Sequence, residues 1–138
     1  MTRIVLDMQT MQMIAMFERG TGAHVKDCVV GEEQVIFVVH EGEIAKAIGK
    51  GGQHVRNLES KLKKRVKLVE FHTDVLQFVR NLVAPVELRE AKLEDTTVFL
   101  SAKDLKSRGL LIGRGASTLR LFESIVQRYF PIKELRVV

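Results

Sequence analysis

The sequence predicts an α+β protein made of two tandem copies of one unit. Each unit is expected to have the element order αββααβ and a three-stranded sheet that helices cover on one face. Two observations support this prediction. The stretch around Gly49 recurs 64 residues later around Gly113, and patterns typical of helices and strands follow in the same order in both halves. A period of roughly 65 residues indicates a tandem duplication.

The repeat extends beyond the glycines into the segment that follows them. Identical residues recur at six pairs of positions: Ile48 and Ile112, Gly49 and Gly113, Gly51 and Gly115, Arg56 and Arg120, Glu59 and Glu123, Ser60 and Ser124. A basic residue also recurs, because Lys50 aligns with Arg114. The apolar spacing of the segment after the glycines matches as well. Composition alone does not produce so many coincidences in so short a stretch.

The first predicted element is a helix over residues 7–19, with Asp7 as its N-cap and Gly20 as its end. Methionine fills irregular gaps in protein cores, so the methionines of this segment are interpreted as core residues. The predicted buried stripe consists of Met8, Met11, Ala15 and one or both of Ile14 and Phe17.

A β-hairpin is predicted next. Residues 24–30 and 34–40 are rich in Val, Ile and Phe, and Gly31, Glu32 and Glu33 separate them. Cys28 lies inside the apolar run and is interpreted as a core residue rather than a nucleophile. The rest of the first half predicts a helix over 43–48, a glycine loop, a helix over 52–63 and an alternating strand over 65–71.

The second half repeats this order. Asp74 begins a helix that runs through Leu82, and Ala84 and Pro85 end it. Strands are predicted over 86–91 and 96–101, with Glu94 and Asp95 in the turn, followed by helices over 103–110 and 116–128 and a strand over 133–138. The two units are therefore expected to cover residues 1–72 and 73–138.

Composition and charge narrow the function class. The apolar residues are dispersed, the N-terminal segment lacks the pattern of a signal peptide, and the chain has one cysteine, so a soluble cytoplasmic protein is expected. The net charge is +5. Residues 1–43 carry seven acidic and three basic side chains, residues 44–68 one acidic and eight basic, and residues 103–128 two acidic and six basic. Positive charge thus gathers around both glycine stretches, as expected of a phosphate-binding surface.

Spacing excludes the nucleotide-binding loops. Neither stretch fits G-x-G-x-x-G after a strand or G-x-x-x-x-G-K-[ST], and each joins two predicted helices. The remaining pattern is G-x-x-G, in which the missing β-carbons allow close approach of a sugar–phosphate backbone. The N-terminus of the following helix presents N–H groups to phosphates, and Lys50 and Arg114 each add a cation. The four histidines are scattered and no carboxylate pair stands out, so no enzyme site, metal site or cofactor is expected.

The stretches IGKGG and IGRGA, each within the order αββααβ, resemble type II KH domains. In KH modules the G-x-x-G loop clamps the backbone of about four nucleotides. Two such domains with almost no linker resemble the RNA-binding part of the NusA family of transcription elongation and termination factors. The chain has no room for the polymerase-binding and S1 domains of bacterial NusA proteins, and so looks like the short archaeal form. The resemblance implies binding of single-stranded RNA, with RNA polymerase or the elongation complex as a further partner.

The resemblance also places the site. The family loop maps onto Gly49, Lys50, Gly51 and Gly52, and onto Gly113, Arg114, Gly115 and Ala116. Further phosphate contacts are expected from Lys46 and Arg56 in the first copy and from Arg108 and Arg120 in the second. Ala45, Ile48, Leu111 and Ile112 are candidates for the floor of a base cleft, with burial in the core as the alternative for Ile48 and Ile112. Because Ala116 replaces the last glycine, the second loop is expected to grip RNA less closely.

Two other interpretations remain open from the sequence. Type II KH domains also resemble parts of ribosomal proteins, which leaves a role in ribosome assembly or translation. A protein-interaction scaffold with KH folds is the other alternative, and the basic residues in the loops argue against it.

Overall fold

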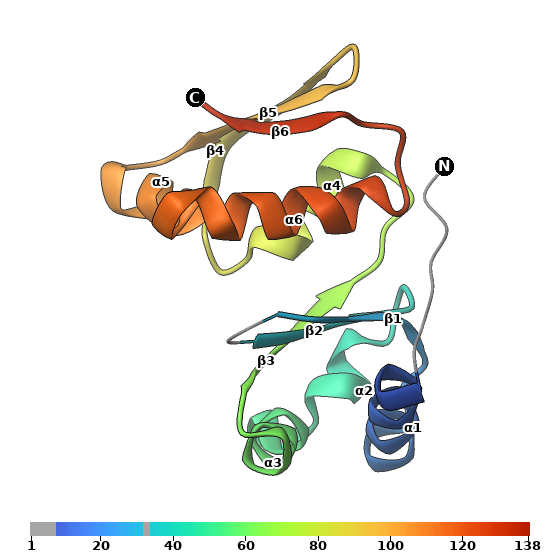
Figure 1. Cartoon of the computed structure of the whole chain (residues 1–138). Helices are drawn as coiled ribbons and strands as arrows, with labels where there is room; N and C mark the ends of the chain where they lie inside the picture. Colours follow the sequence, from blue (N-terminus) through green and yellow to red (C-terminus); the bar gives the residue numbers. More distant parts are fainter. Residues whose placement is uncertain (1–7, 32–33) are drawn as a thin grey trace. The chain divides into compact units, whose positions relative to one another are not determined.

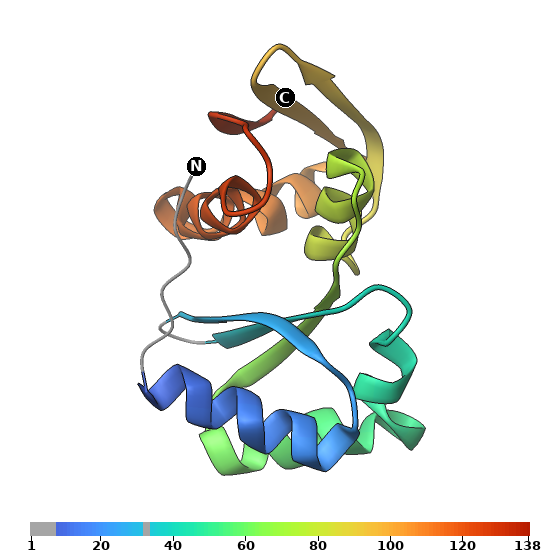
Figure 2. The same ribbon diagram turned by 90° about the vertical axis from the view of Figure 1, so that its right-hand side faces the viewer.

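A computed structural model describes residues 8–31 and 34–138 (Figures 1 and 2). It is α+β, with two three-stranded sheets and helices, as the sequence predicts. The described residues divide into two compact units, one ending at Phe71 and the other beginning at His72. The predicted N-cap Asp7 and the turn residues Glu32 and Glu33 lie outside the described residues. Within the described part of the chain, no helix has the length and hydropathy that a bilayer-spanning segment requires.

The first unit follows the predicted order. Its elements are α1 (Met8–Thr21), β1 (Val25–Val30), β2 (Gln34–Val39), α2 (Ile44–Ile48), the short 3-10 turn η1 (Lys50–Gly52), α3 (Gln53–Leu62) and β3 (Arg65–Glu70). The sheet order is β1-β2-β3, with β1 and β2 antiparallel and β2 and β3 parallel. The three helices lie on one face of this sheet in both views (Figures 1 and 2). The core between them contains Phe17 stacked on Phe37, with ring centroids 4.5 Å apart.

The predicted buried stripe of α1 is correct at Phe17, which is fully buried, and wrong at Met8, Met11 and Ala15. Met8 and Met11 are 76% and 56% exposed, and Ala15 is exposed as well. The buried positions are Thr10, Met13, Phe17 and Thr21, a spacing of three and four residues centred on Phe17. Two buried threonines replace the apolar residues that the sequence reading required. Thr21 is accommodated because its hydroxyl donates to the Phe17 carbonyl oxygen at 2.9 Å and accepts from the Ala23 N–H at 3.0 Å.

The helix α1 also ends later than predicted. Gly20 lies inside the helix, and the chain leaves it at Gly22, which has a φ of +75°. The Gly22 N–H donates to the Glu18 carbonyl oxygen at 2.8 Å. A left-handed residue just after the last helical one is the usual glycine-based helix end, so the second glycine of the pair, not the first, terminates α1. Cys28 is buried at 3% exposure, which confirms its interpretation as a core residue.

The second unit has the same element order. Its elements are α4 (Val75–Val83), β4 (Leu88–Glu94), β5 (Thr97–Ala102), α5 (Leu105–Ile112), the 3-10 turn η2 (Arg114–Ala116), α6 (Ser117–Gln127) and β6 (Glu134–Val137). β4 and β5 are antiparallel, and β5 and β6 are parallel. Asp74 caps α4 as predicted, accepting from the Leu76 N–H at 3.4 Å. Glu94, however, is the last residue of β4 rather than part of the turn, and Asp95 makes the turn with a φ of +56°.

The repeated glutamates link helix to strand in both units. Glu59 Oε2 on α3 accepts from the Val66 N–H on β3 at 2.9 Å, and Glu123 Oε2 on α6 accepts from the Leu135 N–H on β6 at 2.9 Å. Each carboxylate therefore satisfies a part-buried backbone donor at the start of the last strand of its unit. The recurrence of glutamate at this spacing has a structural cause.

Replacing Glu59 with alanine is expected to destabilise the first unit by about 1–2 kcal/mol, because the part-buried Val66 N–H loses its acceptor. Chemical denaturation, with amide exchange to localise the effect, measures this. Glu59→Gln is the matched control, since its amide oxygen still accepts the bond and stability should fall by less. Equal losses in both variants would contradict this role.

Candidate nucleic-acid interface

The first glycine loop joins α2 to α3 and has a backbone that only glycine adopts with ease. Gly49 has φ and ψ of 76° and 176°, Gly51 of 63° and 22°, and Gly52 of 75° and 17°. Three positive φ angles within four residues explain why glycine is needed three times. The Gly49 N–H closes α2 by donating to the Ala45 carbonyl oxygen at 3.1 Å, and the Gly52 N–H donates to the Gly49 carbonyl oxygen at 3.3 Å.

The second loop has the same backbone. Gly113 has φ and ψ of 74° and 177°, Gly115 of 60° and 28°, and Ala116 of 63° and 19°. The Ala116 N–H donates to the Gly113 carbonyl oxygen at 3.3 Å, as Gly52 does in the first loop. Ala116 thus keeps the loop geometry, but it holds a left-handed conformation that costs a residue with a β-carbon about 1–2 kcal/mol.

Ala116→Gly is expected to stabilise the second unit by about 0.5–1 kcal/mol, because relief of the left-handed strain exceeds the added chain entropy of glycine. The reverse change, Gly52→Ala, should destabilise the first unit by a similar amount, since the φ of +75° at this position strains a residue with a β-carbon. Thermal and denaturant unfolding of both variants measure the difference. A loss of stability in Ala116→Gly would contradict the strain.

The glycines of each loop serve two purposes. A β-carbon on Gly49 would lie 2.6 Å from His54 Nδ1, and one on Gly113 would lie 2.9 Å from the backbone nitrogen of Thr118. These first glycines are required by packing against the next helix. A β-carbon on Gly51 or Gly115 would meet nothing within 4 Å. The central glycines therefore face open space, where a ligand can approach the main chain.

The middle cations of the loops are available for a ligand. Lys50 and Arg114 are both exposed, and neither makes an ion pair or a side-chain hydrogen bond within the described residues. Each stands one turn before a helix of ten or more residues, α3 or α6. The N–H groups of those helix ends attract anions, and an adjacent cation adds to the attraction.

Lys46 and Arg56 also lie near the first loop. Arg56 Nη1 donates to the carbonyl oxygen of Gly51, so this side chain is directed at the loop itself. Lys46 Nζ is 3.8 Å from Glu43 Oε1. Glu43 is held in turn by His24, whose Nδ1 lies 2.9 Å from Glu43 Oε1 and whose backbone N–H donates to Oε2 at 2.9 Å. The bond to the His24 side chain is the main reason that the pKa of the Glu43 carboxyl lies below its usual value.

The cations of the second unit are arranged differently. Arg108 on α5 is exposed, and its side chain has no partner within the described part of the chain. Arg120 is paired with Glu123, Nη1 to Oε2 at 3.2 Å, and is not bonded to the loop as its counterpart Arg56 is. The counterpart of Lys46 is Leu110, which is 57% exposed. The surface before the second loop is thus more apolar than the surface before the first. The alignment of Lys46 with Leu110 in the sequence is the signal that could have predicted this difference.

The apolar candidates for a base cleft separate into two groups. Ile48 is 38% exposed, Ala45 is exposed and Ile112 is half-buried, so these three are accessible beside the loops. Leu111 is only 1% exposed and belongs to the core of its unit. Its counterpart Ala47 is fully buried too. Leu111 was therefore wrongly placed among the cleft residues, because it occupies the inward-facing position of α5.

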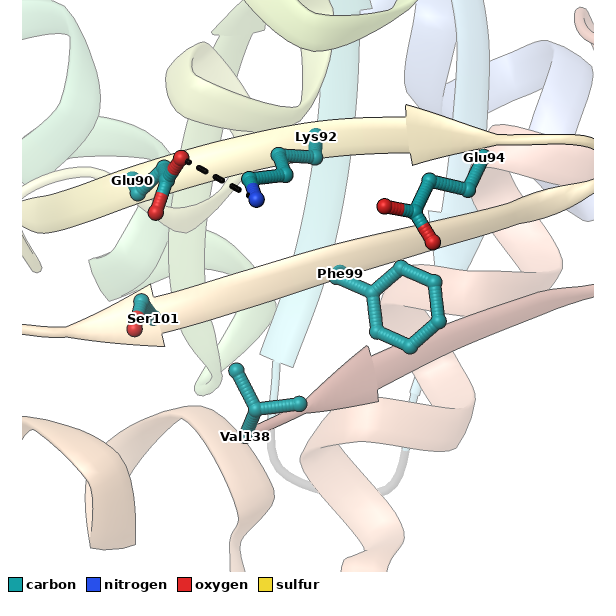
Figure 3. Close-up of a pocket in the computed structure, with 6 residues that line it drawn as sticks. All are labelled: Glu90, Lys92, Glu94, Phe99, Ser101 and Val138. Carbon is teal, nitrogen blue, oxygen red and sulfur yellow. Dashed lines mark ion pairs between the residues drawn. The ribbon is translucent and has the colours of Figure 1, made fainter.

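A hollow on the outer face of the second sheet has a different character (Figure 3). Phe99 forms part of its floor, and Glu90, Lys92, Glu94, Ser101 and Val138 line the rest. Lys92 Nζ is 3.6 Å from Glu90 Oε1, and the Glu94 carboxylate projects over the same face. Acidic side chains outnumber basic ones here, which does not suit a phosphate backbone. Among the described residues, no group of three or more His, Cys, Asp or Glu side chains is placed to hold a metal ion.

Comparison with known proteins agrees with this geometry. Residues 13–108 match the sequence profile of the KH domain, so the chain belongs to the KH domain family. Proteins named "Probable transcription termination protein NusA" align over almost the whole chain. The one from Methanococcus vannielii is 34% identical and aligns over 99% of this chain and 80% of its own length. The one from Halococcus morrhuae is 34% identical and aligns over 98% and 99%. Within the KH family, the chain is a NusA-like protein.

A solved structure supports the fold. The crystal structure of APE1850 superposes with a TM-score of 0.74 and covers 96% of this chain and 100% of its own. The two sequences are 24% identical, so the likeness extends to the fold alone.

Proposed function

We propose that this protein is a noncatalytic factor that binds single-stranded RNA through two tandem type II KH domains, residues 1–72 and 73–138. One observation carries the proposal. Two glycine loops with the same backbone each present an open central glycine and an exposed, unpaired cation in front of a helix N-terminus. A duplicated surface of this kind fits a polymer with regularly spaced phosphates.

The geometry suggests how the strand is held. Phosphates pass over Gly51 and Gly115, where the absence of a β-carbon leaves the main chain open. Lys50 and Arg114 neutralise them, and Arg56 adds a second donor at the first loop. Bases turn toward the accessible apolar surface of Ile48 in the first unit and Ile112 in the second. Unstacked bases of single strands are the usual targets of sequence-reading RNA modules.

The first loop should be the tighter of the two. Lys50 lies in this loop and Arg56 donates to its Gly51 carbonyl oxygen, whereas Arg120 in the second unit is engaged by Glu123. The Ala116 methyl group also adds bulk beside the second loop, where the first has Gly52. Removal of the first-loop cations should therefore cost more affinity than removal of those near the second.

The cellular role that we propose is transcription elongation, termination or antitermination. Support comes from the relatives, which are named as probable transcription termination proteins and align over nearly the whole chain. RNA polymerase or the elongation complex is then the expected assembly in which the protein meets nascent RNA.

Binding of short single-stranded RNA, measured by fluorescence anisotropy over a range of salt concentrations, tests the RNA-binding proposal. If Lys46, Lys50 and Arg56 at the first loop and Arg114 at the second each neutralise one phosphate, log K should fall with log salt with a slope of roughly −3. Double-stranded RNA of the same length should bind more weakly. Affinity that does not depend on salt, or no affinity for any single strand, would overturn the proposal.

The cellular role has its own test. A tagged full-length chain should retain RNA polymerase from extract and should not co-sediment with ribosomal subunits. Co-sedimentation with ribosomes without polymerase would instead favour a role in ribosome assembly or translation.

A further inference from the structure

We propose that the first unit holds a nucleobase in a hollow between α1 and α3, beside the first glycine loop. This inference rests on the proposed RNA binding and adds a place where the strand is read rather than only held. The hollow has a volume of about 80 Å³, so a nucleobase would enter it in part and rest its edge against the lining. Its lining consists of Met16, Phe17, Gly20, Thr21, His54, Asn57, Leu58 and Lys61.

The hollow is continuous with the loop through His54. This residue lines the hollow, and its ring also packs so closely on Gly49 that a β-carbon there would lie 2.6 Å from Nδ1. His54 Nδ1 is 3.3 Å from the Lys46 carbonyl oxygen as well. A strand whose phosphate lies on the loop therefore has one neighbouring nucleotide within reach of the hollow.

The lining has the chemistry of a base site. Phe17, Met16 and Leu58 give an apolar floor. Asn57 is exposed, and its amide makes no hydrogen bond within the described residues. A carboxamide both donates and accepts, so it pairs with the edge of a nucleobase, as asparagine does with adenine.

Charge also favours a nucleotide as the occupant. Lys61 lies one turn beyond Asn57 on α3, is exposed, and has no ion pair within the part of the chain that the structure describes. Among the described residues, no carboxylate lines the hollow. A base held by Asn57 would thus place its own phosphate near Lys61.

The duplication shows that the fold does not require this hollow. At the equivalent spacing in α6, His54, Asn57 and Lys61 are replaced by Thr118, Leu121 and Ile125. Ile125 is fully buried, so the second unit fills the same region with apolar packing. Polar residues at these positions of the first unit are consequently free to serve a ligand.

The test introduces the residues of the second copy into the first. Asn57→Leu and Lys61→Ile should each weaken binding of a short single-stranded RNA about 5- to 10-fold. Gln9→Leu is the matched control, because this exposed amide lies at the other end of α1 and should leave affinity unchanged. A series of RNAs with one abasic position each should identify one position at which the natural chain loses affinity and Asn57→Leu does not.

The outcomes separate this inference from the proposed function. In one outcome, a Lys50→Asp, Gly51→Asp variant loses RNA affinity, while Asn57→Leu and Lys61→Ile bind RNA as tightly as Gln9→Leu does. The base site is then wrong, and the glycine loop remains the RNA-binding site. The base site is also wrong if each abasic RNA loses the same affinity for the natural chain as for the Asn57→Leu variant. If the loop variant binds as the natural chain does, the loop assignment fails, and with it the continuity from which the base site was inferred. Thermal unfolding of each variant confirms that the exposed substitutions leave the fold intact.

Discussion

A variant with aspartate at both Lys50 and Gly51 is expected to bind single-stranded RNA about 100-fold more weakly than the natural chain. The first change removes an exposed cation with no partner in the described structure and puts an anion in its place. The second places a carboxylate on the open side of the loop, where nothing lies within 4 Å of a β-carbon, and its strain at a φ of +63° disturbs the loop further. Loss of one charged contact and repulsion of the phosphate act in the same direction.

The matched control carries the same change in charge elsewhere. Lys92→Asp with Leu93→Asp alters two consecutive exposed residues of β4, a strand of the second unit that is not part of either glycine loop. This control should lose much less affinity, and most of its loss should vanish at high salt. Equal weakening in the two variants would mean that net charge, and not the loop, governs binding. Equal affinity of the loop variant and the natural chain would show that the first glycine loop does not bind RNA.

Gly113→Ala is expected to destabilise the second unit by about 3 kcal/mol. Gly113 has φ and ψ of 74° and 177°, a region in which residues with a β-carbon are strained. The added carbon would also overlap Thr118 Oγ1 and lie 2.9 Å from the Thr118 backbone nitrogen. Because a backbone atom is involved, rotation of a side chain does not relieve the clash. Amide exchange of α6 and β6 during denaturation measures the loss.

Two neighbouring glycines serve as controls for this prediction. Gly109→Ala should be neutral or stabilising by up to about 1 kcal/mol, because Gly109 lies inside α5 and its β-carbon would meet nothing within 4 Å. Gly49→Ala should cost less than Gly113→Ala, since its nearest contacts all belong to the His54 side chain. A smaller effect at Gly113 than at Gly109 would contradict the packing role of the first loop glycine.

The sequence predicted the element order because its strongest signals are local. The spacing of apolar residues, the cap at Asp74 and the repeat around Gly49 and Gly113 each depend on short stretches of chain. Element boundaries shifted by one to three residues where two signals compete. At the end of α1, for example, Gly20 and Gly22 are both candidates, and only the left-handed φ of Gly22 decides between them.

The buried face of α1 could not be predicted from the sequence, because two of the residues on it are polar. Thr10 and Thr21 are buried, and the hydroxyl of Thr21 is satisfied by the helix itself. A prediction from hydropathy therefore places Met8 and Met11 on the buried face, although both are exposed in the structure. Similarly, the aligned arginines Arg56 and Arg120 have different partners, Gly51 and Glu123, and identity at aligned positions did not reveal this.

The most direct test of the account is an RNA titration followed by amide resonances of the full chain. We expect the amides of Lys50, Gly51 and Gly52 to shift most in the first unit, and those of Gly115 and Ala116 to shift in the second. Shifts concentrated on the outer face of the second sheet, around Phe99, with unchanged glycine loops would contradict it.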